Sequence, residues 1–226
     1  MFVVATIVMI LAQASPTPLP LTPAAAKTWD AWRGKAAACK APLGRLPKAA
    51  TVARSLAVRV AAEQCLRGLL DDPVVAALPD ADGRAVGSRM WGEISPVDAA
   101  NTAWLKTVIP ADGWFRASRD GAETASNAWL IVQHSPDEAF QREVLRRMEP
   151  LAKAGEVKGG DYALLYDRVE MFAGRPQYYG SQYRCVNGRW APYTLRDPAG
   201  VEARRKALGM SSMAENGKRF PASARC

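Results

Sequence analysis

The sequence has very little of what metal and redox sites require. It contains one histidine, His134, and four cysteines, of which no two have C-x-x-C spacing. Zinc and similar metals are bound by several closely spaced His and Cys side chains, so neither a metal site nor a bound cofactor is expected. The G-x-S-x-G, G-x-x-x-x-G-K-[ST] and G-x-G-x-x-G patterns are also absent. Their absence argues against a hydrolase nucleophile elbow, a P-loop and a dinucleotide-binding turn.

The N-terminus lacks both a basic residue and an apolar run long enough to span a bilayer. An apolar run from Phe2 to Leu11 precedes Ala12-Gln13-Ala14, which fits the small-x-small pattern of signal-peptidase sites. A transmembrane helix needs about twenty apolar residues. We therefore interpret residues 1–14 as a signal peptide and residues 15–25 as a proline-rich spacer. The mature chain would be periplasmic or extracellular, with no transmembrane segment.

The charge is strongly positive, with a formal net charge of +8 and a pI near 9.5. An exported basic protein meets anionic lipid, lipopolysaccharide or wall polymer, so the expected partner is an anionic envelope polymer or a small anionic ligand. Nucleic acid is not expected in that compartment. The plainer alternative is a solvated basic surface with no dedicated partner.

An even number of cysteines in an exported chain indicates disulfides. Four cysteines allow three pairings. We favour Cys39 with Cys65 and Cys185 with Cys226, because each of these pairs stays within its own region.

The remaining pattern predicts a mainly α (α+β) protein: a helical domain with one late β-hairpin. Residues 26–75 are predicted to form a helical hairpin broken near Pro42 and Gly44, and residues 76–226 a mainly helical domain in which 78–95 are irregular. Ser-Pro or Asp-Pro pairs at residues 95, 135 and 197 predict helix starts. Apolar stripes predict helices after Ser135 and from about Gly160 to Phe172, and a buried helix at 128–132. Asn187-Gly188 predicts a β-hairpin turn.

A series of short motifs lies in order between about Glu63 and Gly209. The motifs are Val97-Asp98-x-x-Asn101-Thr102, Gly113-Trp114, Ala128-Trp129-Leu130-Ile131-Val132-Gln133-His134, Phe140-Gln141, Asp167-Arg168-Val169, Gly174-Arg175-Pro176-Gln177-x-Tyr179-Gly180-Ser181-Gln182 and Asp197-Pro198. Their order resembles a bacterial family catalogued as domain of unknown function 6624. The resemblance implies a bacterial source and a shared fold, and it implies no activity.

His134 is the first candidate for chemistry, since an imidazole transfers protons near neutral pH. It lies at the predicted C-terminal end of a buried helix, where it either faces a cleft or simply caps the helix. Asp167 either orients His134 in a carboxylate–imidazole pair or forms an ordinary ion pair.

The Gly174–Gln182 segment is the second candidate, for ligand binding. Arg175 offers a planar fork for an anion, while Gln177 and Gln182 both donate and accept hydrogen bonds. The alternative is a structural turn in which Arg175 pairs with a local acid. Asn101 and Gln141 either complete a polar cluster or satisfy buried backbone groups.

These observations predict an exported protein that is either a small-ligand or envelope-substrate-processing domain, with His134 as acid/base, or a non-catalytic envelope-binding or structural protein. The sequence does not decide whether it is an enzyme.

Overall fold

The computed structural model describes residues 20–219. The signal peptide, residues 15–19 of the proline-rich spacer and Cys226 lie outside the described residues. The spacer was predicted to reach residue 25, but α1 already begins at Pro23, with Thr22 as its N-cap. Within them the chain is mainly helical with one late antiparallel hairpin, as predicted. The elements are α1 (Pro23–Gly44), α2 (Val52–Gly68), a 3-10 turn η1 (Leu69–Asp71), α3 (Pro73–Ala76), α4 (Asp80–Val108), α5 (Ala117–Asp120), α6 (Ala122–Gln133), α7 (Glu138–Lys153), α8 (Gly159–Phe172), β1 (Tyr183–Val186), β2 (Arg189–Pro192), α9 (Val201–Ala207) and α10 (Met213–Gly217).

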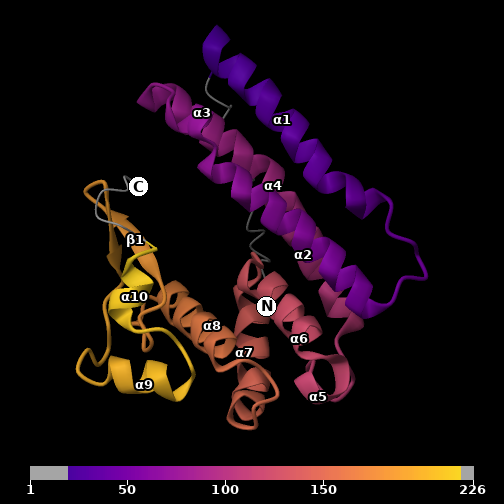
Figure 1. The fold of residues 1–226 in the computed structure, drawn as a ribbon, viewed down its shortest axis with the longest axis vertical. Helices are drawn as coiled ribbons and strands as arrows, with labels where there is room; N and C mark the ends of the chain where they lie inside the picture. The colour runs from indigo at the N-terminus through magenta and orange to yellow at the C-terminus, as the bar shows by residue number, and fades with distance from the viewer. Residues whose placement is uncertain (1–19, 220–226) are drawn as a thin grey trace, which may run out of the picture.

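The helices pack around two apolar clusters, and α2 contributes to both. The first cluster joins α1, α3 and the N-terminal half of α4 through residues such as Trp32 and Met90, with Leu66 of α2. The second joins α6, α7 and α8 to Leu56 of α2 and Leu105 of α4. Figure 1 shows the long helices α1, α2 and α4 on one side, and α8 with the hairpin, α9 and α10 on the other. The predicted hairpin of residues 26–75 therefore shares its cores with the rest of the chain.

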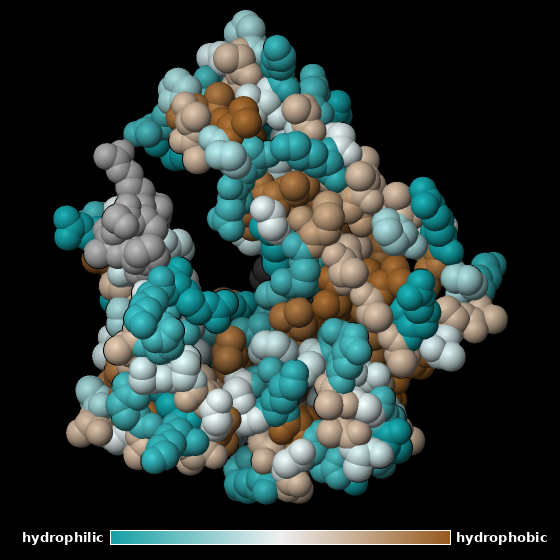
Figure 2. Space-filling model, in the orientation of Figure 1, coloured by the Kyte–Doolittle hydropathy of each residue, from teal (hydrophilic) through white to brown (hydrophobic). Residues whose placement is uncertain are grey.

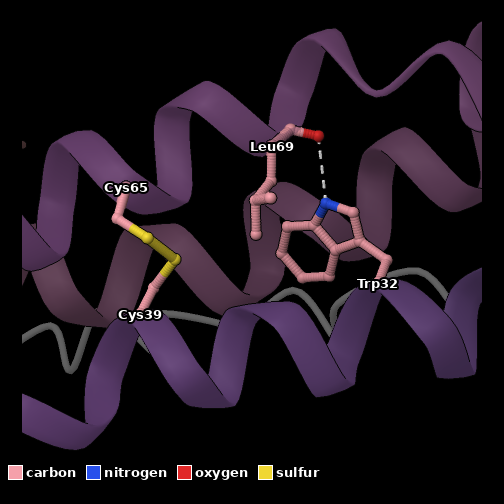
Figure 3. The surroundings of a disulfide bond; sticks show 4 residues. All are labelled: Trp32, Cys39, Cys65 and Leu69. Atoms are coloured by element: carbon pink, nitrogen blue, oxygen red, sulfur yellow. Dashed lines mark hydrogen bonds between the residues drawn. A yellow bond between two sulfur atoms is a disulfide. The ribbon is translucent and has the colours of Figure 1, made fainter.

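The disulfide between Cys39 and Cys65 joins α1 to α2, as predicted (Figure 3). Its Cα atoms are 5.6 Å apart, an ordinary separation for a disulfide. Beside it, the buried Trp32 donates its indole N–H to the carbonyl of Leu69 at 3.1 Å. The two interactions fix where α2 lies along α1. Cys185 is also disulfide-bonded, and its expected partner lies outside the described residues.

The prediction that residues 78–95 are irregular was wrong, and so was the prediction of a helix start at Ser95. Helix α4 begins at Asp80 and runs through Pro96 to Val108. Val86, Met90 and Ile94 are fully buried, and their spacing places them on one face against the first cluster. Burial of this apolar face outweighs the hydrogen bond that Pro96 removes.

Two other helix starts lie later than predicted. Asp137, not Ser135, is the N-cap of α7, and its carboxylate accepts the N–H of Phe140 at 2.9 Å. Helix α9 begins at Val201, after a turn in which Asp197 accepts the N–H of Gly200. Phe172, the last residue of the apolar stripe that predicts this helix, is 46% exposed, because it lies in the last turn of α8.

The predicted hairpin turn is confirmed. Asn187 and Gly188 both have positive φ, 52° and 74°, as a type I′ turn requires. Val186 of β1 pairs with Arg189 of β2 directly across it.

Candidate functional site

Helix α2 carries a polar stripe that no local sequence motif marks. Arg59, Glu63 and Arg67 are spaced four residues apart and so share one face of the helix. Asp98 and Asn101 of α4 meet this face. Asn101 accepts a hydrogen bond from Arg59 at 3.1 Å and donates one to Glu63 at 3.3 Å. A side-chain network therefore crosses the junction between the two apolar clusters.

His134 completes this network from the end of α6. It is the C-cap residue of α6, and its Nδ1 contacts the carboxylate of Glu63, which is fully buried. Arg67 Nε lies 3.1 Å from the same nitrogen and 3.6 Å from the Glu63 carboxylate. The carboxylate can only accept, so we place the imidazole proton on Nδ1, where it is donated to Glu63. Nε2 has no hydrogen-bond partner among residues 20–219.

Burial lowers the pKa of His134, and the hydrogen bond and charge of Glu63 oppose that shift. The shift below 6.5 leaves the imidazole neutral at pH 7, with the lone pair of Nε2 available. The helix-cap reading of His134 is thus right about its position. Its side chain, however, contacts Glu63 of another helix.

Arg67 connects His134 to a second carboxylate. Its Nη2 donates to Asp98 at 2.8 Å. Burial raises the pKa of Asp98 to about 6, although the charge of Arg67 counteracts it. The other oxygen of Asp98 is buried without a partner in the part of the chain that the structure describes. A carboxyl held in this way is poised to change its protonation near neutral pH.

Asp167 has contacts different from those expected. Its fully buried carboxylate accepts the backbone N–H groups of Tyr178, Tyr179 and Ser181 at 2.7, 2.9 and 2.9 Å. The carboxylate that contacts His134 is Glu63 instead. Asp167 thus shapes the loop after α8 that carries Ser181 and Gln182.

The residues of the Gly174–Gln182 segment have two kinds of role: some hold the fold together, and Gln182 lines a pocket. Arg175 forms a two-point ion pair with Glu170, with bonds of 2.9 and 2.6 Å. This is the alternative in which Arg175 pairs with a nearby acid instead of a ligand. Gln177 is fully buried and bonds to the backbone of Gln182 and Tyr193. Neither lines the pocket described below, whereas Gln182 does.

Gln141 and Asn101 lie in the interior, each 1% exposed. Gln141 donates to the carbonyls of Val132 and Ser135 at 3.0 and 3.1 Å, so it closes the end of α6 just before α7 begins. Asn101 orients Glu63. Both support the segment that carries His134, and neither lines the pocket.

A pocket of about 490 Å³ opens beside His134, a size that suits a small molecule. Figure 2 shows the surface hollowed between the long helices and the part that carries the hairpin. The lining comes from α2, α6, α8, the loop after α8, the start of β1 and residues 210–219. It comprises Gln64, Arg67, Trp129, Leu130, Gln133, His134, Leu164, Arg168, Ser181, Gln182, Tyr183, Met210, Asn216 and Arg219.

Arg168 is the pocket residue with the most distinctive environment. Its Nη1 donates to the carbonyl of Gln133 at 2.7 Å, and its Nη2 lies 3.4 Å from Oε1 of Gln182. With the Gln133 amide turned so that its oxygen faces Arg168, that oxygen accepts from Nε at 2.9 Å. Burial, assisted by the charge of Arg67, lowers the pKa of Arg168 to about 10. The guanidinium remains charged at pH 7 and is held by neutral groups.

Residues 20–219 contain neither a metal-binding cluster nor a membrane-spanning helix. Within that range no three His, Cys, Asp or Glu side chains gather closely enough to bind a metal ion. No helix in the same range is long and apolar enough to cross a membrane.

Comparison with known protein families gives one match. A family of unknown function, DUF6624, matches residues 70–221, which is more than half of the sequence. The chain belongs to the DUF6624 family. The match includes His134, Arg168 and Gln182, whereas Glu63 and Arg67 precede it. No curated protein and no solved structure matches the chain.

Proposed function

We propose that this DUF6624 protein is an exported ligand-processing protein in which His134 acts as the acid/base on a small anionic ligand. The observation that carries the proposal is the arrangement of the imidazole. Nδ1 is held by the buried Glu63, and His134 lines a pocket with Arg67 and Arg168. An imidazole oriented by a carboxylate, beside a cleft with cationic groups, is an arrangement used for proton transfer.

The chemistry available to the chain's own residues follows from this geometry. Nε2 of the neutral imidazole accepts a proton from a ligand hydroxyl, a ligand amine or water. The positive charge that then develops on the ring is stabilised by the Glu63 carboxylate at Nδ1. Arg67 and Arg168 attract a negative ligand and stabilise negative charge that develops on it.

Export is supported by two features of different kinds. The Cys39–Cys65 disulfide is typical of an oxidising compartment such as the periplasm or the cell exterior. The leader-like residues 1–14 precede the described residues and give the same interpretation. Purified protein from an expressing cell should therefore start after Ala14 when its N-terminus is sequenced.

We expect His134→Gln to abolish proton-transfer activity while leaving the fold intact. Loss of a general acid/base costs about 10²- to 10⁴-fold in rate. The assay would screen aryl phosphates and aryl esters, and then compare kcat/KM of wild type and variant at equal concentrations of folded protein. Arg175→Gln, a change at an exposed side chain outside the pocket, is the matched control and should keep the wild-type rate.

The pH dependence gives a second readout. Because the pKa of His134 is lowered from 6.5, the rate should fall on acidification with a midpoint below 6.5. Glu63 raises the pKa of His134, so Glu63→Gln should move that midpoint to lower pH. Unchanged activity in His134→Gln, or a melting temperature several degrees lower than wild type, would favour a structural histidine.

A non-catalytic envelope-binding protein is the second candidate, favoured by the net charge of +8. Binding through a basic surface weakens with salt, because exposed charges more than about 10 Å apart are screened at 0.1 M. This candidate therefore predicts that sedimentation with anionic vesicles or wall polymer is lost as salt is raised from about 0.05 to about 0.5 M, over which the screening length falls from ~14 to ~4 Å. The same binding in His134→Gln would separate this candidate from the first, and salt-independent binding would contradict it.

A further inference from the structure

The charged side chains that line the pocket beside His134 are all positive. Three guanidinium groups reach it, those of Arg67, Arg168 and Arg219, and none of its lining residues is an aspartate or a glutamate. Arg67 is paired from behind by Asp98. The other two have no carboxylate within 4.0 Å among residues 20–219, which separates them from Arg175 and its Glu170 partner.

Arg168 shows this imbalance most clearly, because it is also the most enclosed of the three. Charged side chains are seldom buried without a counter-ion. Its partners are the carbonyl of Gln133 and side-chain amide oxygens. The carbonyl ends α6, so Arg168 also stabilises the C-terminal end of that helix. That role offsets part of the burial cost and leaves the positive charge unneutralised.

Two more donors at the pocket lack acceptors. Nε1 of Trp129 and Nδ2 of Asn216 are buried without a hydrogen-bond partner in the described part of the chain, and both residues line the pocket. Buried donors are nearly always paired in folded proteins. The lining thus has no carboxylate and holds two donors without an acceptor.

We infer that this pocket binds a phosphoryl group carried on a small apolar or aromatic molecule, with Arg168 as its main anchor. The inference rests on the proposed function for the identity of the site, but not on any reaction at His134. A phosphoryl group carries nearly two negative charges and three acceptor oxygens. The guanidiniums approach from α2, from α8 and from the turn after α10. A tetrahedral group accepts from several such directions, whereas a carboxylate has two oxygens in one plane.

The remaining pocket residues indicate what kind of molecule carries the phosphoryl group. Trp129, Leu130, Leu164 and Met210 supply an apolar wall. An aromatic or aliphatic group would bury its surface against these side chains and release water. Binding should therefore be tighter for a phosphate ester than for inorganic phosphate.

The test is calorimetric titration of the full chain with phenyl phosphate, inorganic phosphate and benzoate at fixed ionic strength and pH 7.5. We expect phenyl phosphate to bind most tightly and benzoate, its carboxylate counterpart, most weakly. Arg168→Gln should weaken phenyl phosphate binding by about tenfold or more, as expected for the loss of a charge-assisted hydrogen bond. Arg219→Gln, at an exposed position, should weaken it as well, and it serves as the test variant if Arg168→Gln does not fold.

Controls distinguish this inference from the proposed function. Arg175→Gln should bind like wild type, and His134→Gln should retain binding even where it abolishes activity. Benzoate binding as tight as phenyl phosphate would overturn the phosphoryl assignment. Absence of phenyl phosphate binding, or an equal loss in Arg175→Gln, would overturn the site itself. Full activity in His134→Gln with phosphoryl binding intact would instead contradict only the proposed function.

Discussion

Asp167→Ala should lower the melting temperature by about ten degrees. The substitution leaves three buried backbone N–H groups, those of Tyr178, Tyr179 and Ser181, without their acceptor. Each orphaned buried donor costs about 1–3 kcal/mol, and partial relaxation of the loop would leave a net loss of about 3 kcal/mol or more. For a chain of this size, 1 kcal/mol corresponds to about 2–4 °C. Differential scanning calorimetry measures the change directly.

Asp161 provides the matched control on the same helix. Its carboxylate accepts one hydrogen bond, from Ser126 at 2.8 Å, so Asp161→Ala should cost much less. The loop that Asp167 shapes carries Gln182, and therefore Asp167→Ala should also weaken ligand binding at the pocket. An unchanged melting temperature combined with lost activity would contradict this account and restore a catalytic role for Asp167.

Glu63→Ala should have the second large effect. It removes a fully buried carboxylate from His134, Asn101 and Arg67 at once. Breaking a buried charged network by removing one partner costs about 3–5 kcal/mol, which again corresponds to about ten degrees in melting temperature. Chemical denaturation with urea would give the free energy of unfolding. Glu63→Gln keeps the shape and part of the hydrogen bonding, so it should lose less stability.

Glu93 is the corresponding control for Glu63. Its ion pair with Lys40 lies at the surface, with 37% of the Glu93 side chain exposed, and such pairs contribute at most about 1 kcal/mol. A loss in Glu63→Ala no greater than that in Glu93→Ala would show that the polar network is not part of what holds α2, α4 and α6 together.

Sequence patterns predicted the elements whose signals are local. Asn187-Gly188 specifies its turn by backbone conformation alone, and the stripe of Phe140, Val144 and Met148 specifies α7 by its period. They failed for α4, where Ser95-Pro96 is a strong local start signal. There the burial of Val86, Met90 and Ile94 against α1 and α2 decides the outcome. A local helix-start signal is overridden where a long apolar face packs against helices elsewhere in the chain.

The candidate site was predicted in the same uneven way. His134 was singled out as the only histidine, and Gln182 by its motif, and both line the pocket. Glu63 was missed because it lies in an Ala-rich helix and its partners are distant in sequence. The four-residue spacing of Arg59, Glu63 and Arg67 is the one signal that would have shown a polar face on α2. Arg168 follows Asp167 directly, yet its importance depends on having no carboxylate within 4.0 Å among residues 20–219, which only the fold reveals.

Helix α2 lies before the residues that match the family, yet the site is complete only when α2 is present. Family membership rests on residues 70–221, but the carboxylate that holds His134 comes from residue 63. The disulfide at Cys65 lies between Glu63 and Arg67 on the same helix. A chain trimmed to the matched residues would keep the imidazole and Arg168 while losing the group that fixes the proton on Nδ1. It would also uncover the apolar surface that Leu56 and Leu66 now bury. Relatives in which a different segment fills the place of α2 could therefore share the fold and the histidine and still differ in the basicity of that histidine.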